Sequence, residues 1–181
     1  WPRAVARRMD PATSRRSAVL LLFGPRPAVE GPDAEGPGTE NATAADPAAA
    51  APGELTAGSP GPWRAPERAE DLDLLLVRRS TTVRHHAGQV ALPGGGAEPG
   101  DHGPQSTALR EAHEETGADP ASIDVLGVLP PLGIPVSGNL VTPVIGWWHP
   151  PGPIAPMDPA EIDLVRRVPL PAFQATLAAL P

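Results

Sequence analysis

The residues best suited to chemistry are three glutamates near the middle of the chain. Glu111, Glu114 and Glu115 are separated by three and four positions, so on a helix their side chains share one face. Like charges this close repel one another unless a positive group lies among them. Because Mg²⁺ prefers oxygen ligands and is often held by a few carboxylates together with substrate phosphates, the spacing predicts a metal site for phosphate chemistry. A solvated helix face is the alternative, since runs of charge are common on surfaces.

A run of glycines precedes these glutamates. Gly94, Gly95 and Gly96 lack a Cβ atom, so their backbone can turn tightly and come close to a metal ion or to a substrate phosphate. An ordinary turn is the alternative. The position of the run before a charged helix favours a functional role.

The helix that carries the glutamates has start and stop signals of its own. Pro104 suits a first turn, Ser106 or Thr107 suits the cap position, and Gly117 stands where a C-cap residue is expected. We therefore predict a helix between Pro104 and Gly117. We expect His113, on the face opposite the glutamates, to face solvent.

Other parts of the chain predict the elements that must position this helix. Short apolar runs bounded by glycine, proline or charged residues predict strands. Strands and helices alternate, which predicts a mixed α/β fold. The predicted strands span residues 17–23, 71–77, 89–92, 123–129, 139–148 and 165–168, and a closing helix spans residues 171–180.

The composition limits the classes of function. The formal net charge is −7 and all 14 basic residues are arginine, so binding of nucleic acid through a general basic surface is not expected. The absence of lysine and cysteine excludes a Schiff-base lysine, disulfides, thiolate zinc sites and cysteine nucleophiles. No apolar run reaches the length of a membrane span, so we expect a cytoplasmic protein without a membrane partner.

The length of 181 residues fits one domain. Residues 1–16 are rich in arginine and are predicted to form an N-terminal arm on a domain that spans residues 17–181. Residues 25–70 are rich in proline, alanine and glycine and hold few large apolar side chains. They are therefore predicted to be a disordered acidic insertion between two strands of that domain.

Taken together, the glycines and the charged helix resemble the signature of the Nudix hydrolases. That signature has a glycine, five residues, a glutamate, seven residues, and then Arg-Glu, an aliphatic position, any residue, Glu-Glu, any residue and Gly. In this chain the signature glutamate falls on His102, and Glu98 and Asp101 are the nearby acids that could replace it. The matching positions are Gly96, Arg110, Glu111, Ala112, Glu114, Glu115 and Gly117.

The segment before the glycines resembles the additional motif of coenzyme A pyrophosphatase-like Nudix hydrolases. Val77 and Leu92 replace the threonine and the phenylalanine that are usual in that motif. An aspartate at the place of Asp101 is an ordinary variant in that subfamily. The residues at the expected spacing are Leu75, Leu76, Arg79, Ser80, Arg84, Gly88, Pro93, Gly94 and Gly95.

The resemblance implies a Nudix fold, with a mixed β-sheet sandwiched between helices, and hydrolysis of the diphosphate bond of coenzyme A or its thioesters with Mg²⁺ or Mn²⁺. It also implies a truncated C-terminus, because members of this group usually continue beyond the position at which this chain ends. Two alternatives stay open: a Nudix hydrolase of another nucleoside diphosphate derivative, such as a dinucleotide or a nucleotide sugar, and a catalytically silent nucleotide-sensing module. The partner would be a small-molecule diphosphate, and the protein could form a homodimer.

The resemblance also implies roles in catalysis and metal binding. Glu111, Glu114 and Glu115 would hold the metal ion, with Asp101 and Glu98 as further candidate ligands. The Arg110 guanidinium would hold a catalytic glutamate in place by a charged hydrogen bond.

Substrate binding draws on other residues. Arg79 and Arg84 are candidates for binding substrate phosphates because a planar guanidinium matches phosphate geometry. Solvated arginines beside a strand are the alternative. Stacking on a base would have to use Trp147, Trp148 or another tryptophan, because the chain has no tyrosine and only two phenylalanines.

Overall fold

Strand β1 (Arg15–Pro25) is the central element of the sheet. Successive side chains of a strand point to opposite faces, and Ala18, Leu20 and Leu22 of β1 are each no more than 1% exposed. One face of β1 therefore forms part of the hydrophobic core. The computed structural model describes residues 14–26, 68–83, 86–135 and 137–178.

The sheet is mixed and contains eight strands. Besides β1, these are β2 (Leu72–Arg79), β3 (Val90–Ala91), β4 (Gly94–Gly96), β5 (Ile123–Val128), β6 (Leu132–Ile134), β7 (Asn139–Trp148) and β8 (Ile162–Pro169). The main path runs β3-β2-β1-β7-β5, with β4 beside β1, β6 beside β7 and β8 beside β2. β1 is parallel to β7, whereas β1 and β2, and β5 and β7, are antiparallel.

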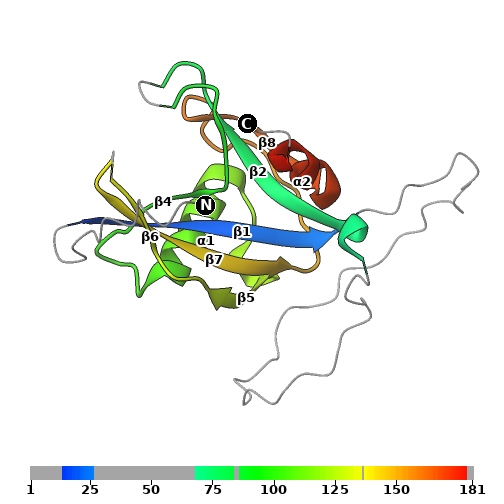
Figure 1. Cartoon of the computed structure of the whole chain (residues 1–181), viewed down its shortest axis with the longest axis horizontal. Coiled ribbons are helices and arrows are strands. Elements are labelled where there is room, and N and C mark those ends of the chain that lie inside the picture. The colour runs from blue at the N-terminus through cyan, green and yellow to red at the C-terminus, as the bar shows by residue number, and fades with distance from the viewer. Residues whose placement is uncertain (1–13, 27–67, 84–85, 136, 179–181) are drawn as a thin grey trace, which may run out of the picture. The chain divides into compact units, whose positions relative to one another are not determined.

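In the part of the chain that the structure describes, two α-helices accompany the sheet. In Figure 1, α1 (Pro104–Thr116) lies behind the sheet and α2 (Leu170–Ala178) lies at its near side. α1 buries Ala108 and Ala112 in the same core as β1, and α2 packs beside β2 and β8. This α/β arrangement, a mixed sheet with two helices, is the predicted fold class. Within the described residues, neither helix combines the length and the apolar character that crossing a membrane would require.

The ends of α1 confirm one cap prediction and correct the other. Gly117 has a left-handed φ of 73°, and its N–H donates to the His113 carbonyl at 2.8 Å, as a C-cap residue does. The N-cap, however, is Gly103 rather than Ser106 or Thr107. The Ser106 hydroxyl donates to the Gly103 carbonyl at 2.9 Å, and the Thr107 hydroxyl donates to Asp101 at 2.8 Å, instead of accepting a backbone N–H as a cap does.

The strand boundaries agree with the prediction for β7 and differ elsewhere. β1 begins at Arg15, so Arg15 and Arg16 belong to the sheet and not to the predicted arm. Neither β4 nor β6 was predicted. Residues 1–13 of the arm and residues 27–67 of the predicted insertion lie outside the described residues.

In the described residues, a short 3-10 turn precedes each of two strands, η1 (Ala69–Asp71) before β2 and η2 (Pro120–Ser122) before β5.

Trp148, at the end of β7, is 1% exposed, and its Nε1 donates to the Ser122 hydroxyl at 3.0 Å. The Arg167 guanidinium lies 5.7 Å from the centre of its ring. Trp148 is therefore a core residue, and the suggestion that it could stack on a base is wrong.

The core assignment can be tested with two leucines. Leu20→Ala is expected to lower the free energy of unfolding by about 3 kcal/mol, because Leu20 is 0% exposed and its truncation leaves a cavity. The control is Leu132→Ala, for which we expect a change within about 0.5 kcal/mol, because Leu132 is 61% exposed. Denaturant unfolding measures both, and equal effects would contradict the assignment.

Candidate functional site

The short strand β4 brings the glycines against the helix that carries the glutamates. It pairs antiparallel with β1, with Gly95 opposite Ala18. A Cβ atom on Gly95 would lie 2.4 Å from the carboxyl carbon of Glu111, and one on Gly94 would lie 2.3 Å from the Ala18 carbonyl oxygen. Both distances are far inside van der Waals contact. A side chain on Gly94 would collide with the backbone of β1, whereas one on Gly95 would displace the carboxylate of Glu111.

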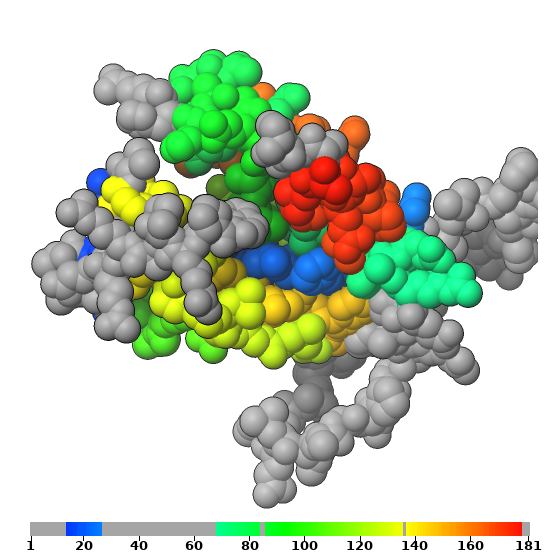
Figure 2. Space-filling model, in the orientation of Figure 1, coloured from blue at the N-terminus to red at the C-terminus, as the bar shows by residue number. Residues whose placement is uncertain are grey.

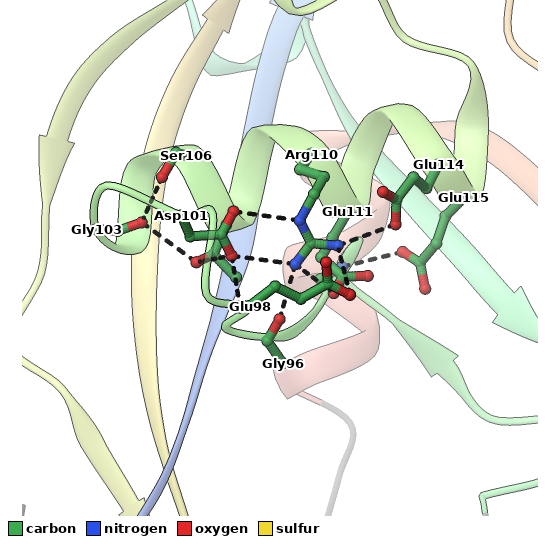
Figure 3. A network of polar contacts seen from close by, with 11 residues as sticks. Gly96, Glu98, Asp101, Gly103, Ser106, Arg110, Glu111, Glu114 and Glu115 are labelled. Atoms are coloured by element: carbon green, nitrogen blue, oxygen red, sulfur yellow. Dashed lines mark hydrogen bonds and ion pairs between the residues drawn. The ribbon is translucent and has the colours of Figure 1, made fainter.

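The Arg110 guanidinium joins the glutamates to the loop before the helix (Figure 3). It donates to Glu111 Oε1 at 3.1 Å and to Glu114 Oε2 at 3.0 Å. It also donates to both carboxylate oxygens of Asp101, each at 3.2 Å, and to the Gly96 carbonyl at 2.8 Å. The positive group that the clustered glutamates require is therefore supplied in part by the chain itself.

Asp101 is the acid next to the displaced signature position, and its carboxylate is held within the chain. Its side chain is 7% exposed, and Oδ2 also accepts from the Thr107 hydroxyl at 2.8 Å and from the Glu98 N–H at 2.9 Å. The hydrogen bond from Arg110 holds the pKa of Asp101 well below its usual range. Asp101 thus fixes Arg110 and the first turn of α1, whereas the carboxylate of Glu98 and the side chain of His102 are exposed.

Glu115 has a different partner from Glu111 and Glu114. Its Oε2 accepts the Gly94 N–H at 3.0 Å. Burial, together with the negative charges of Glu111 and Glu161, raises the pKa of Glu115 to about 7 in spite of that hydrogen bond. Burial also raises the pKa of Glu111, against the opposing effect of Arg110. The site therefore disfavours the charged forms of two of its glutamates.

A further acid, Glu161, enters the site from the segment before β8. It is close enough to Glu111 and Glu115 for its charge to raise both pKa values. Its backbone carbonyl accepts the Ser80 N–H at 2.7 Å, and its carboxylate lies 3.3 Å from the Arg79 guanidinium. Arg79, whose buried Nε has no hydrogen-bond partner among the described residues, therefore faces the acids.

The carboxylate oxygens of these acids are ligands that a divalent cation such as Mg²⁺ prefers. They do not form a complete metal site. Among the residues that the structure describes, no three acidic or histidine side chains are arranged to hold a metal ion as they stand. Arg110 donates to Glu111 and Glu114, while the Gly94 N–H donates to Glu115. Burial raises the pKa values of Glu111 and Glu115, so a cation beside them would favour their charged forms. Oxygen donors in such a state fit Mg²⁺ or Mn²⁺.

Two cavities lie beside the paired strands β1 and β4. The larger one, of about 620 Å³, is lined by the backbone of β4 and by residues of β1 and β7. The smaller one, of about 500 Å³, lies beside the first turn of α1 and includes Asp101 and Thr107 in its wall. Both volumes are in the range of small-molecule sites. Figure 2 shows part of β1, in blue, at the molecular surface between α2, in red, and the yellow residues that lead into β7.

The structure brings most of the predicted site residues together. Arg110 contacts Glu111, Glu114 and the Gly96 carbonyl. Glu115 contacts the Gly94 N–H. Arg79 lies with the acids rather than in the wall of either cavity, and Arg84 lies outside the described residues. His113 is exposed, as predicted, and its Nδ1 is 3.0 Å from the Ala118 carbonyl oxygen.

Three residues of this region were missed by sequence reasoning: Glu161, Arg15 and Arg16. Glu161 follows a proline-rich segment without a periodic pattern, and it reaches the acids because β8 pairs with β2, which places Ile162 opposite Arg79. The two arginines were assigned to an arm because of their composition. Extending the strand period backwards from Ser17 would have found them.

A family model and the relatives found by comparison point to the same family. A model of the NUDIX domain matches residues 64–179. A protein from Photorhabdus laumondii named uncharacterized Nudix hydrolase NudL is 50% identical over 97 residues, which cover 54% of this chain and 51% of the relative. The protein of the same name from Pectobacterium atrosepticum is 59% identical over 73 residues, which cover 40% of this chain and 38% of the relative. The chain thus spans about half or less of the length of these relatives.

Solved structures agree in fold. A Nudix hydrolase from M. smegmatis, RenU, has a TM-score of 0.51 at 20% identity and covers 93% of this chain and 88% of its own. The Ap4A hydrolase of C. elegans has a TM-score of 0.51 at 13% identity, with coverage of 92% and 99%. At these identities the likeness establishes the fold and says nothing of the substrate.

The raised pKa of Glu115 predicts a pH-dependent effect of its replacement. With divalent metals chelated, Glu115→Gln is expected to stabilise the protein more at about pH 8 than at about pH 5. The pKa is about 7 in the folded chain and 4.5 ordinarily, so between these values the folded chain holds more protons than the unfolded chain and loses stability as the pH rises. Above about pH 7 the difference should reach the order of 2 kcal/mol.

Denaturant unfolding across this pH range measures the effect of the replacement. Glu70→Gln serves as the control, because the Glu70 side chain is 60% exposed and its removal should change stability little at any pH. An effect of Glu115→Gln that does not vary with pH would contradict the assignment of Glu115 as a buried carboxylate whose charged form destabilises the folded chain.

Proposed function

Because the chain belongs to the NUDIX domain family, we propose that it is a metal-dependent hydrolase of diphosphate bonds, acting on coenzyme A or its thioesters. The observation that carries the proposal is that Glu111 and Glu115, both with raised pKa values, lie against the backbone of Gly95 and Gly94. Carboxylates in that state favour a cation, and a glycine backbone admits a phosphate group close to it.

Glu111, Glu114 and Glu115 are the residues that would hold Mg²⁺ or Mn²⁺. When bound, such an ion would neutralise charge on the diphosphate and lower the pKa of a coordinated water toward neutrality. Arg110 would keep its hydrogen bonds to Asp101 and to the Gly96 carbonyl, and so hold the side chains of Glu111 and Glu114 beside β4. In this proposal Asp101 is a positioning residue, because both of its oxygens already accept hydrogen bonds within the chain.

The reaction would need a proton acceptor as well as a cation. The oxygen of a water molecule would bond to one phosphorus atom, and the bond from that phosphorus to the bridging oxygen would break. We propose that Glu161 accepts the proton of the water, because its carboxylate comes from outside α1 and lies near both Glu111 and Glu115. Its contact with Arg79 would orient it.

The choice of coenzyme A rests on the motif that precedes the glycines and includes Arg79 and Ser80. The NudL relatives carry no substrate in their names. A Nudix hydrolase of a dinucleotide or a nucleotide sugar, and a nucleotide-sensing module without turnover, are therefore outcomes that the assay below separates from the proposal.

The assay compares coenzyme A, a dinucleotide and a nucleotide sugar with Mg²⁺ or Mn²⁺. We expect hydrolysis of coenzyme A to two phosphate-containing products, and no hydrolysis once the metal is chelated. Glu111→Gln and Glu115→Gln should each lower kcat/KM by about 100-fold or more, because each removes a charge that the cation requires. Product analysis by chromatography measures both effects. Turnover that survives either substitution would contradict the mechanism, and tight binding without turnover would favour the sensing module.

A second prediction concerns the contact between β4 and α1. Gly95→Ala should lower kcat/KM by about 100-fold while the protein stays folded, because the new methyl group would displace the flexible carboxylate of Glu111. The matched control is Gly127→Ala in β5, where nothing lies within 4 Å of the added Cβ. Steady-state kinetics and circular dichroism of both variants give the comparison. Full activity of the Gly95 variant would show that this contact does not position Glu111.

A further inference from the structure

The position of the proposed proton acceptor, Glu161, depends on its backbone. Its side chain is 54% exposed, so packing does not fix the carboxylate. The carboxylate lies 3.3 Å from the Arg79 guanidinium, but an ion pair between partly exposed side chains contributes little on its own. The backbone that carries Glu161 must therefore be held in place for the carboxylate to stay beside Glu111 and Glu115.

A tight turn with the sequence Asp158-Pro159-Ala160-Glu161 precedes β8. The N–H groups of Glu161 and Ile162 donate to the Asp158 carbonyl at 3.0 and 2.9 Å. The Asp158 side chain closes the turn a second time, because its Oδ1 accepts the Ala160 N–H at 2.9 Å. Aspartate at the first position and proline at the second are residues that such a turn favours. The carboxylate of Asp158 thus fixes the residue directly before Glu161.

The turn is attached to the two elements that carry the residues around Glu161. The Met157 N–H, just before the turn, donates to the Glu115 carbonyl in the last turn of α1 at 3.3 Å. The Ser80 N–H, just after β2, donates to the Glu161 carbonyl at 2.7 Å. A change in the turn would therefore move Glu161 relative to both Glu115 and Arg79.

The pairing of β8 with β2 changes register directly after the turn. Arg78 lies opposite Leu164 and Arg79 lies opposite Ile162, which leaves Asp163 as an extra residue in β8. Such a bulge interrupts the ladder and bends the strand that contains it. The direction of the residue directly before β8 therefore depends on the turn and not on regular strand pairing alone.

We propose that Asp158 is a positioning residue, which keeps the Glu161 carboxylate beside Glu111 and Glu115 by closing this turn. The inference rests on the proposed function for the role of Glu161 as the proton acceptor. Asp158 acts through the hydrogen bond from the Ala160 N–H, which needs an acceptor oxygen and not a charge. Asparagine should therefore serve in its place. Asp158 is exposed, so its substitution creates no cavity in the core.

A second turn that begins with the same three residues provides a matched control. In Asp119-Pro120-Ala121-Ser122, the Ala121 N–H donates to Asp119 Oδ1 at 2.9 Å, and the Ser122 N–H donates to the Asp119 carbonyl at 3.0 Å. This turn leads into β5, which carries none of the acids of the site. Asp119 is exposed like Asp158. Asp119→Ala therefore removes the same hydrogen bond without touching the segment that carries Glu161.

Steady-state kinetics of the full chain with coenzyme A and Mg²⁺ test the inference. Asp158→Ala is expected to lower kcat about tenfold and to leave KM within about twofold, because a displaced proton acceptor slows the chemical step and not substrate binding. Asp158→Asn should keep kcat within about twofold, since its amide oxygen can accept the same N–H. Asp119→Ala should lower Tm as much as Asp158→Ala does and leave kcat unchanged. An equal loss of kcat in the two alanine variants, or in Asp158→Asn, would overturn the inference.

A double substitution tests whether Asp158 acts through Glu161. In the Glu161→Gln protein the proton acceptor is already lost, so adding Asp158→Ala should change kcat by less than about twofold. Losses that multiply would show that Asp158 acts on another part of the site and would overturn the inference.

Amide hydrogen exchange of the full chain, with metals chelated, gives a readout that needs no turnover. Asp158→Ala should speed exchange at Ala160 and Glu161 by about tenfold, because the turn loses one of its hydrogen bonds, while Asp158→Asn should leave it unchanged. If no diphosphate is hydrolysed, the proposed function fails, and faster exchange in Asp158→Ala alone still supports the placement of Glu161 by Asp158. Equal exchange in Asp158→Ala and in the unchanged protein would overturn the inference in either case.

Discussion

The arrangement of the site depends on one guanidinium in a group of carboxylates. Arg110 donates to Asp101, Glu111 and Glu114 and to the Gly96 carbonyl, so most of its N–H donors are used within the chain. Without such a group, three glutamates on one helix face would repel one another. Because Asp101 is itself held by Thr107 and by the Glu98 N–H, the same interaction sets the loop before α1, the first turn of α1 and the distance from α1 to β4.

That distance can be short without displacing other atoms because Gly94 and Gly95 have no side chain. The three residues of β4 pair with Ser17, Ala18 and Val19 of β1, so their positions are fixed from the sheet side as well as from the helix side. Glu115 adds a direct link by accepting the Gly94 N–H. The raised pKa of Glu115 follows from this packing, because burial that places a carboxylate against a strand also removes water from it.

The sequence alone was sufficient to predict α1, β7 and the grouping of Arg110 with the glutamates. These features depend on local periodicity and on end signals such as Gly117. β4 was read as a turn, since a run of glycines has no alternation of apolar and polar side chains from which a strand can be inferred. Glu161 could not be found either, because it reaches the acids through the pairing of β8 with β2. The need for a positive group was foreseen, but part of it is met by Arg110 and not by a metal ion.

The site and the pairing of β1 with β2 use opposite ends of β1. β1 and β2 pair through Phe23, Gly24 and Pro25, and the Arg26 N–H donates to the Asp71 carbonyl at 2.7 Å. The site uses the other end of β1, where β4 pairs with Ser17 to Val19. Phe23 lies four positions after Val19, which is about 13 Å along a strand. The chain can therefore depart after Arg26 and return at η1 without altering the register of β4 on β1. Chain length added between these strands changes the closure entropy by little and leaves the contacts among β4, Arg110 and the glutamates as they are.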